Sequence, residues 1–218
     1  MLCGMALVPD EETQRRIIGF QGKHMHTLNG PKLGTETNLP HVTVFQSRFN
    51  PKDLSRSDLV EILCATDMPE IPASKFTKVA YHPRHWVFAH IECPEWLTRL
   101  HEVALPRLDD KVLRKEINLS IDLRDHTVRQ AAYYGRYGYR YSLEEYLPHV
   151  TLGCPLGVEV VPSWFEADFN DSLGGAPVRF SSAAFYIAGE AGALAEIICE
   201  VPPTPTSYLL ALGKERKD

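Results

Sequence analysis

The pentapeptide LPHVT occurs twice in the chain, and each copy places a histidine two residues before a threonine. Side chains alternate between the faces of a β-strand, so we expect His41 and Thr43 to share one face, as do His149 and Thr151 in the second copy. A neutral imidazole can accept a proton from water, and a protonated imidazole can donate one to a leaving oxygen. Threonine hydroxyls can donate hydrogen bonds to phosphate oxygens. The two pairs therefore predict acid–base chemistry on a phosphodiester, with no metal ion and no cofactor.

The segments that follow the two pentapeptides occur in the same order, which indicates that the chain is internally duplicated. Each pentapeptide precedes a predicted helix and a predicted β-hairpin, which are residues 54–67 and 75–93 in the first half and 162–174 and 178–201 in the second. Two tandem copies of one supersecondary unit can pack about a pseudo-twofold axis. Equivalent strands then lie together at the centre, so we expect both motif strands to face one cleft.

These elements predict an α+β fold, bilobal and internally duplicated, with mainly antiparallel sheets and flanking helices around the central cleft. We expect a single domain over residues 1–201, with lobes of roughly 1–110 and 111–201 and with strand exchange between them left open. Residues 202–218 are rich in proline and then in charge, and we expect them to form a C-terminal tail.

Local patterns predict three further elements. A strand over residues 2–8 precedes a helix over 11–23, whose first turn is acidic, as the positive end of a helix favours. Residues 95–110 are predicted to form a helix that is broken near Pro106, because proline lacks the N–H group that an interior helical position donates.

Composition limits the classes of function. The formal net charge of −5 argues against a general basic surface for long nucleic acid, but it allows a local pocket for a small anion. The five cysteines form no CxxC pair, which favours a reducing cytoplasm. No segment has the features of a signal peptide or the length of a membrane span, and nothing indicates an obligate protein partner. We therefore expect a cytoplasmic monomer without membrane contact.

An aromatic and basic segment directly precedes the second motif and is a candidate for binding a substrate. Residues 131–146, AAYYGRYGYRYSLEEY, interleave tyrosines with arginines. Aromatic rings can stack on a nucleobase and guanidinium groups can bind phosphate, so Tyr139, Arg140 and Tyr141 are the predicted contacts. Phe45 would join them if its strand alternates without interruption. A loop and strand with ordinary tyrosine packing would explain the same residues.

The sequences HVTV at 41–44 and HVTL at 149–152 resemble the two HxTx motifs of the two-histidine (2H) phosphoesterase superfamily, which includes 2′-5′ RNA ligase-like and cyclic phosphodiesterase-like proteins. The resemblance covers residues 2–201, and its specific part is the two tetrapeptides and the repeat around them. It implies metal-independent hydrolysis of 2′,3′-cyclic phosphates or 2′-5′ linkages in small nucleotides or short oligonucleotides. Carried over residue by residue, the catalytic positions are His41, Thr43, His149 and Thr151.

Two alternatives remain open. A catalytically inactive nucleotide- or RNA-binding module of the same fold would keep the motifs without turnover. A metal-dependent hydrolase would use the closely spaced His24 and His26 together with His41. The basic turn YHPRH, residues 81–85, is either a site for a distal phosphate or a solvated hairpin tip. Turnover by paired histidines predicts a bell-shaped pH profile whose two apparent pKa values belong to the pair.

Overall fold

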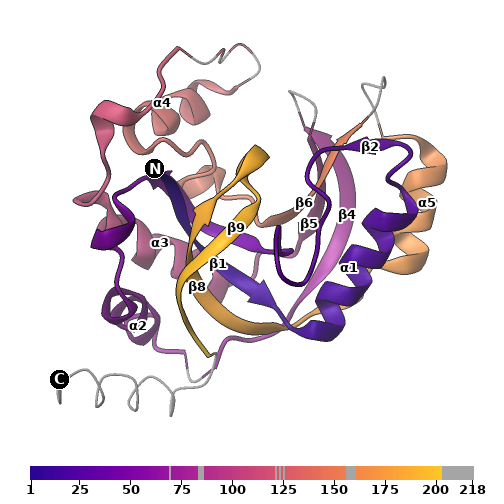
Figure 1. The fold of residues 1–218 in the computed structure, drawn as a ribbon, viewed down its shortest axis with the longest axis horizontal. Coiled ribbons are helices and arrows are strands. Elements are labelled where there is room, and N and C mark those ends of the chain that lie inside the picture. Colours follow the sequence, from indigo (N-terminus) through magenta and orange to yellow (C-terminus); the bar gives the residue numbers. More distant parts are fainter. Residues whose placement is uncertain are drawn as a thin grey trace.

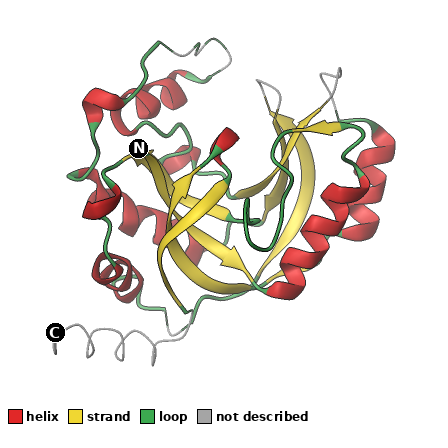
Figure 2. Ribbon diagram, in the orientation of Figure 1, coloured by secondary structure: helices red, strands yellow, loops and turns green. Residues whose placement is uncertain are grey.

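Figure 1 shows the protein as a computed structural model, which describes residues 1–68, 70–82, 86–120, 122, 124, 126–155 and 161–202. These residues form two antiparallel sheets flanked by helices, which confirms the α+β fold class (Figure 2). The first sheet has the order β3-β1-β8-β9 and contains, in that order, Val42–Arg48, Leu2–Pro9, Phe180–Ala188 and Leu194–Val201. The second sheet has the order β2-β6-β5-β4-β7 and contains Leu28–Asn29, His149–Pro155, Trp86–Ile91, Ser74–His82 and Pro177–Val178.

Each sheet combines strands from both halves of the sequence. The first sheet joins β3, the strand of the first motif, to the late hairpin of β8 and β9 through β1. The second sheet joins β6, the strand of the second motif, to the early hairpin of β4 and β5. Lobes defined by these sheets therefore do not coincide with residues 1–110 and 111–201, because the halves exchange their hairpins.

Helices cover the outer faces of both sheets. α1 (Glu11–Lys23) and α5 (Ser163–Ser172) lie on the second sheet, and α2 (Arg56–Cys64) and α3 (Glu95–Asp109) lie on the first (Figure 1). α4 (Val128–Tyr137) lies away from these four helices. Short 3-10 helices in the described residues are Pro51–Asp53, Arg114–Glu116, Leu143–Glu145 and Glu190–Gly192. None of the helices among the described residues combines the length and the apolar character that crossing a membrane requires.

Two helices differ from the local predictions. α3 is continuous through Pro106, because its buried face, which includes Leu105 and Leu108, packs against the first sheet on both sides of the proline. The aromatic and basic segment, for which a loop and strand was one interpretation, begins within α4. Thr127 caps this helix by accepting a hydrogen bond from the backbone N–H of Gln130. The Thr-x-x-Gln capping box is the local sequence signal that indicates this helix.

A β-bulge follows both motifs at the same position. On β3, the pairing with β1 passes from Thr43 to Phe45 and skips Val44. On β6, the pairing with β5 skips Leu152, the residue after Thr151. Both skipped residues are fully buried. A bulge shifts the alternation of side chains by one residue. The histidine and threonine of each motif therefore share one face of the strand, and after the bulge odd- and even-numbered residues exchange faces.

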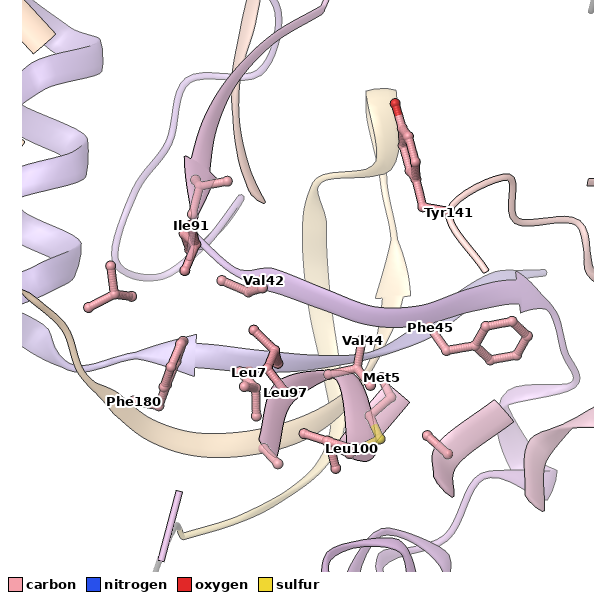
Figure 3. Close-up of a cluster of buried hydrophobic side chains, with 14 of the residues drawn as sticks. Met5, Leu7, Val42, Val44, Phe45, Ile91, Leu97, Leu100, Tyr141 and Phe180 are labelled. Carbon is pink, nitrogen blue, oxygen red and sulfur yellow. The ribbon is translucent and has the colours of Figure 1, made fainter. Parts of the chain in front are cut away.

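Apolar side chains of β1, β3 and α3 form the core beneath the first motif. Figure 3 shows Met5 and Leu7 of β1, Val44 of β3, and Leu97 and Leu100 of α3 in this cluster. All five side chains are fully buried. Their packing holds α3 against β3 and brings the next residue of the helix to the bulge.

That residue, His101, joins β3 to the segment that precedes the second motif. Its Nδ1 donates to the carbonyl oxygen of Val44 at 2.6 Å, and its Nε2 accepts from the backbone N–H of Leu143 at 2.8 Å. The ring of Tyr146 stacks on the imidazole at 4.2 Å between centroids, and its hydroxyl donates to the carbonyl oxygen of Thr43 at 3.2 Å. Burial lowers the pKa of His101 to about 4, so the ring is neutral near pH 7. One donor and one acceptor on the same ring require that neutral form.

We predict that His101→Leu lowers the free energy of unfolding by about 2–4 kcal/mol, because it leaves the Val44 carbonyl and the Leu143 N–H buried without partners. Chemical denaturation at pH 7 measures the change. The same substitution at the exposed His26 is the control and should change stability by less than about 0.5 kcal/mol. Equal effects at both positions would show that the two hydrogen bonds of His101 do not stabilise the fold.

Candidate functional site

A cavity of about 310 Å³ lies between the two sheets and is lined by side chains of both motifs. The four residues predicted from the repeat, His41, Thr43, His149 and Thr151, all line it. His41 directly precedes β3 and His149 begins β6, so strands of different sheets bring the two motifs together. The expectation that both motif strands face one cleft is therefore met by the geometry.

The two motif histidines are oriented by the same local hydrogen bond. Nδ1 of His41 lies 3.0 Å from the carbonyl oxygen of Leu39, and Nδ1 of His149 lies 2.7 Å from that of Leu147. A carbonyl oxygen only accepts, so Nδ1 carries the proton in both rings. In the neutral form, Nε2 of each ring is then the unprotonated nitrogen, which can accept a proton. The Leu-Pro-His part of the pentapeptide thus sets the tautomer of each histidine.

Desolvation controls the charge of both histidines. It lowers the pKa of His41 to about 4 and that of His149 to about 3. For His149, the nearby rings of His82, His90 and His41 add a smaller effect in the same direction. Both motif histidines are therefore neutral near pH 7 when the cavity holds no anion. A bound anion would favour the charged form and raise these pKa values.

A buried tyrosine connects Thr43 to a second polar side chain of β3. Nε2 of Gln46 donates to the hydroxyl of Tyr186 at 3.2 Å, and this hydroxyl lies 3.3 Å from Oγ1 of Thr43. Because the amide supplies a donor, the Tyr186 hydroxyl can donate its own proton to Thr43. Burial raises the pKa of Tyr186, so the phenol keeps that proton. Thr43 is then left with its hydroxyl proton free to donate towards the cavity.

Gly4 provides the space for the Tyr186 ring. The two residues are paired across β1 and β8. A Cβ atom at position 4 would lie 2.8 Å from Cε1 of Tyr186 and 2.7 Å from the carbonyl oxygen of Phe45. A larger residue at this position would therefore displace the tyrosine that contacts Thr43.

The second motif has different neighbours. The ring of His149 stacks on Phe88 of β5, with centroids 3.7 Å apart and an interplanar angle of 20°. Tyr141 meets the same imidazole edge-on at 5.5 Å. Thr151 is paired with Phe88 across the strands. The two motifs therefore share their hydrogen-bond geometry but differ in their aromatic surroundings.

The lining of the cavity is basic. Two guanidinium groups, those of Arg48 and Arg140, line it, and its lining among the described residues includes no aspartate or glutamate. Nη1 of Arg140 lies 3.0 Å from Nε2 of His126, and its Cζ lies 4.7 Å from the centre of the Tyr141 ring. A cavity with two cations and no carboxylate suits an anionic ligand, although the whole chain carries a net charge of −5.

Three of the four predicted substrate contacts line the cavity, and one does not. Tyr139, Arg140 and Tyr141 are in the lining. Phe45 is fully buried in the core, where its ring lies edge-on to those of Phe49 and Tyr139. The bulge is the reason, because it turns Phe45 to the face opposite Thr43.

The same change of phase brings Gln46 and Arg48 to the cavity, and sequence reasoning missed both. Two consecutive apolar residues, Val44 and Phe45, interrupt an otherwise alternating strand, and this was the available signal of a bulge. Trp86 and Phe88 of β5 also line the cavity without having been predicted.

In the part of the chain that the structure describes, the metal-dependent alternative finds no suitable cluster of ligands. His24 and His26 lie in a turn after α1 rather than on a strand. Nε2 of His24 contacts Oδ2 of Asp168 on α5 at 2.6 Å, and its ring packs against Phe165. Among the described residues, no group of three His, Cys, Asp or Glu side chains could hold a metal ion.

The basic turn YHPRH is described only in part. Nε2 of His82 lies 2.9 Å from Nε2 of His90, so a histidine of the turn contacts a histidine of β5. Pro83, Arg84 and His85 lie outside the described residues.

The overall fold is similar to that of a solved structure, TT0787 of Thermus thermophilus. The two share 16% sequence identity with a TM-score of 0.54, over 93% of this chain and 98% of TT0787. No protein-family model matches the chain. No curated protein matches it either. At this identity, the similarity concerns the fold alone.

We predict that both motif histidines carry their proton on Nδ1 and titrate well below the ordinary histidine value of about 6.5. Long-range ¹H–¹⁵N correlation spectra of ¹⁵N-histidine-labelled protein, recorded from pH 8 downwards, measure the tautomer and the pKa together. Inorganic phosphate should raise the pKa of at least one of the two rings. A pKa above the ordinary value in the free protein, or a proton on Nε2 at neutral pH, would contradict this description of the cavity.

Proposed function

We propose that the protein is a metal-independent phosphodiesterase of the two-histidine phosphoesterase type. Its proposed substrates are nucleotides with a 2′,3′-cyclic phosphate or a 2′-5′ linkage. The observation that carries the proposal is that His41 and His149 line one cavity with the same tautomer, each beside a threonine hydroxyl. The basic lining supports an anionic substrate.

In the proposed reaction, water attacks phosphorus while one imidazole accepts its proton on Nε2. A bond forms between phosphorus and the water oxygen, and the bond from phosphorus to the departing ribose oxygen breaks. The other histidine, as an imidazolium, donates its proton to that oxygen. Thr43 and Thr151 donate hydrogen bonds to the non-bridging oxygens, where negative charge is concentrated.

The imidazolium must form although desolvation disfavours it. The pKa of about 4 for His41 and about 3 for His149 describes the cavity without a ligand. A phosphodiester is an anion, and its charge within a few ångströms favours a protonated imidazole. We therefore propose that binding of the substrate promotes protonation of the general acid.

Arg140, Tyr139 and Tyr141 are proposed to contact the substrate. The guanidinium of Arg140 can bind a phosphate, and the tyrosine rings form an aromatic wall beside His149. None of the five cysteines, all of which the structure describes, forms a disulfide bond, which supports a reducing compartment such as the cytoplasm.

The test is an assay of 2′,3′-cyclic nucleotides and 2′-5′ linked dinucleotides with and without a chelator. We expect turnover that the chelator does not change. His41→Ala and His149→Ala should each lower kcat by about 10²–10⁴-fold, as loss of a general acid or base does. Thr43→Val and Thr151→Val should each lower it by about a hundredfold.

His26→Ala, at an exposed histidine outside the cavity, is the matched control and should be fully active. Turnover that disappears with the chelator would point to the metal-dependent alternative. Nucleotide binding without turnover of any substrate would instead favour the inactive binding module.

A second prediction concerns Tyr186, which acts in this proposal as a positioning residue for Thr43. Tyr186→Phe removes only the hydroxyl and should lower kcat by up to about tenfold, because one neutral hydrogen bond is lost. In the Thr43→Val background, the same change should have no further effect, because the residue it positions is absent. Additive effects in the double variant would show that Tyr186 does not act through Thr43.

A further inference from the structure

The cavity extends along β3 well beyond the first motif. Thr43 pairs with Ala6 of β1, and Arg48 pairs with Leu2, four residues further along β1. At about 3.4 Å per residue, this separates the two backbone positions by about 14 Å. One phosphate group is much smaller than this distance. The cavity therefore has two ends, one at the histidines and one at Arg48.

The far end combines a cation with an aromatic ring and an amide. Arg48 lines it together with Tyr134 of α4 and Asn118. Arg48 is half-buried, and no carboxylate of the described residues forms an ion pair with its guanidinium. The hydroxyl of Tyr134 donates to the carbonyl oxygen of Asn118 at 3.2 Å, which fixes the ring. Oδ1 of Asn118 accepts from the N–H of Ser120 at 3.0 Å, so the amide nitrogen remains free to donate.

Close packing holds this end in place. Gly138 ends α4 in the left-handed conformation, with φ of 71°. A Cβ atom there would lie 3.0 Å from Oγ of Ser47 and 3.3 Å from Cγ1 of Ile117. The end of α4 therefore sits directly on β3, and this contact fixes Tyr134 relative to Arg48. At the rim, Asn118 and the neighbouring Leu119 are exposed, so a ligand can extend out of the cavity.

We propose that this far end binds a second phosphate and the base next to it, so that the substrate is an oligonucleotide of at least two nucleotides rather than a mononucleotide. The inference rests on the proposed function for the position of the reacting phosphate. Arg48 binds the phosphodiester that precedes the reacting group on its 5′ side, because a guanidinium matches two phosphate oxygens at once. The Tyr134 ring offers a face for stacking, and such stacking tolerates any base.

The experiment compares adenosine 2′,3′-cyclic phosphate with a diadenosine that ends in the same cyclic phosphate. In the native protein, kcat/KM should be at least about tenfold higher for the dinucleotide, as a hydrogen-bonded charge pair provides. Arg48→Gln should remove this preference, lowering kcat/KM about tenfold for the dinucleotide and no more than about threefold for the mononucleotide. Arg48→Lys keeps the charge and should restore part of the preference.

Arg136→Gln is the matched control. Arg136 is exposed, lies over the ring of Tyr137 at 4.9 Å and is not in the cavity lining. The substitution removes the same charge as Arg48→Gln, and it should leave the preference for the dinucleotide intact. Thermal unfolding of all variants checks that each is folded. Equal kcat/KM for the two substrates in the native protein, or equal losses for both in Arg48→Gln, would overturn the second subsite.

Calorimetric binding of adenosine 2′-phosphate, one of the two products that ring opening can give, and of its dinucleotide counterpart separates this inference from the proposed function. The dinucleotide should bind more tightly, and Arg48→Gln should reduce the slope of log K against log salt by about 0.7, the value for one contact to a single strand. If neither the cyclic phosphates nor the 2′-5′ linked dinucleotides are hydrolysed but these binding differences are found, the hydrolase proposal fails and the subsite stands. Equal binding of the mononucleotide and the dinucleotide overturns the subsite whether or not turnover occurs.

Discussion

The imidazole of His101 supports the arrangement of the whole cavity. A bulge disrupts the strand ladder locally, and the carbonyl oxygen of Val44 at the bulge finds its partner in Nδ1 of this ring. The other ring nitrogen holds the backbone of Leu143, whose φ of 53° lies in the left-handed region that non-glycine residues rarely adopt. One buried side chain thus fixes both the strand of the first motif and the segment that carries Tyr139 and Tyr141. Because the two hydrogen bonds of His101 are made in the core and not in the cavity, they hold Tyr139 and Tyr141 at the cavity wall without occupying its space.

The second constraint is the desolvation of the motif histidines. An imidazole in this cavity is neutral near pH 7 unless an opposite charge is brought to it, since burial removes the water that would stabilise the cation. The guanidinium groups of Arg48 and Arg140 add positive charge to the same space, which further favours an anion over a neutral ligand. Binding of an anion and protonation of His41 or His149 are therefore linked, and each should favour the other.

The sequence predicts those features of the fold and the site that depend on neighbouring residues, and it misses those that depend on contacts with distant strands. The four motif residues could be placed in one cavity because the alternation of strand side chains and the internal repeat can both be recognised in the sequence. The bulge at Val44 could not be placed in the same way, so Phe45 was assigned to the cavity and Gln46 was missed. A bulge depends on pairing with a partner strand, and a one-residue shift reverses the face of every later side chain. Tyr186 was also missed, since it approaches Thr43 from a strand 143 residues away in sequence.

The hairpin exchange explains why two equal motifs come to lie in unequal surroundings. β3 lies beside β1 and is followed across the sheet by β8, which supplies Tyr186, whereas β6 lies beside β5, which supplies Phe88. Duplication therefore repeats the histidine, the threonine, the preceding leucine carbonyl and the bulge, but not the side chains around them. A ligand bound between the motifs would meet a polar network on one side and stacked rings on the other. In the proposed function, residues outside the repeat would thus set the orientation of the substrate, so the two histidines need not have interchangeable roles although their local geometry is the same.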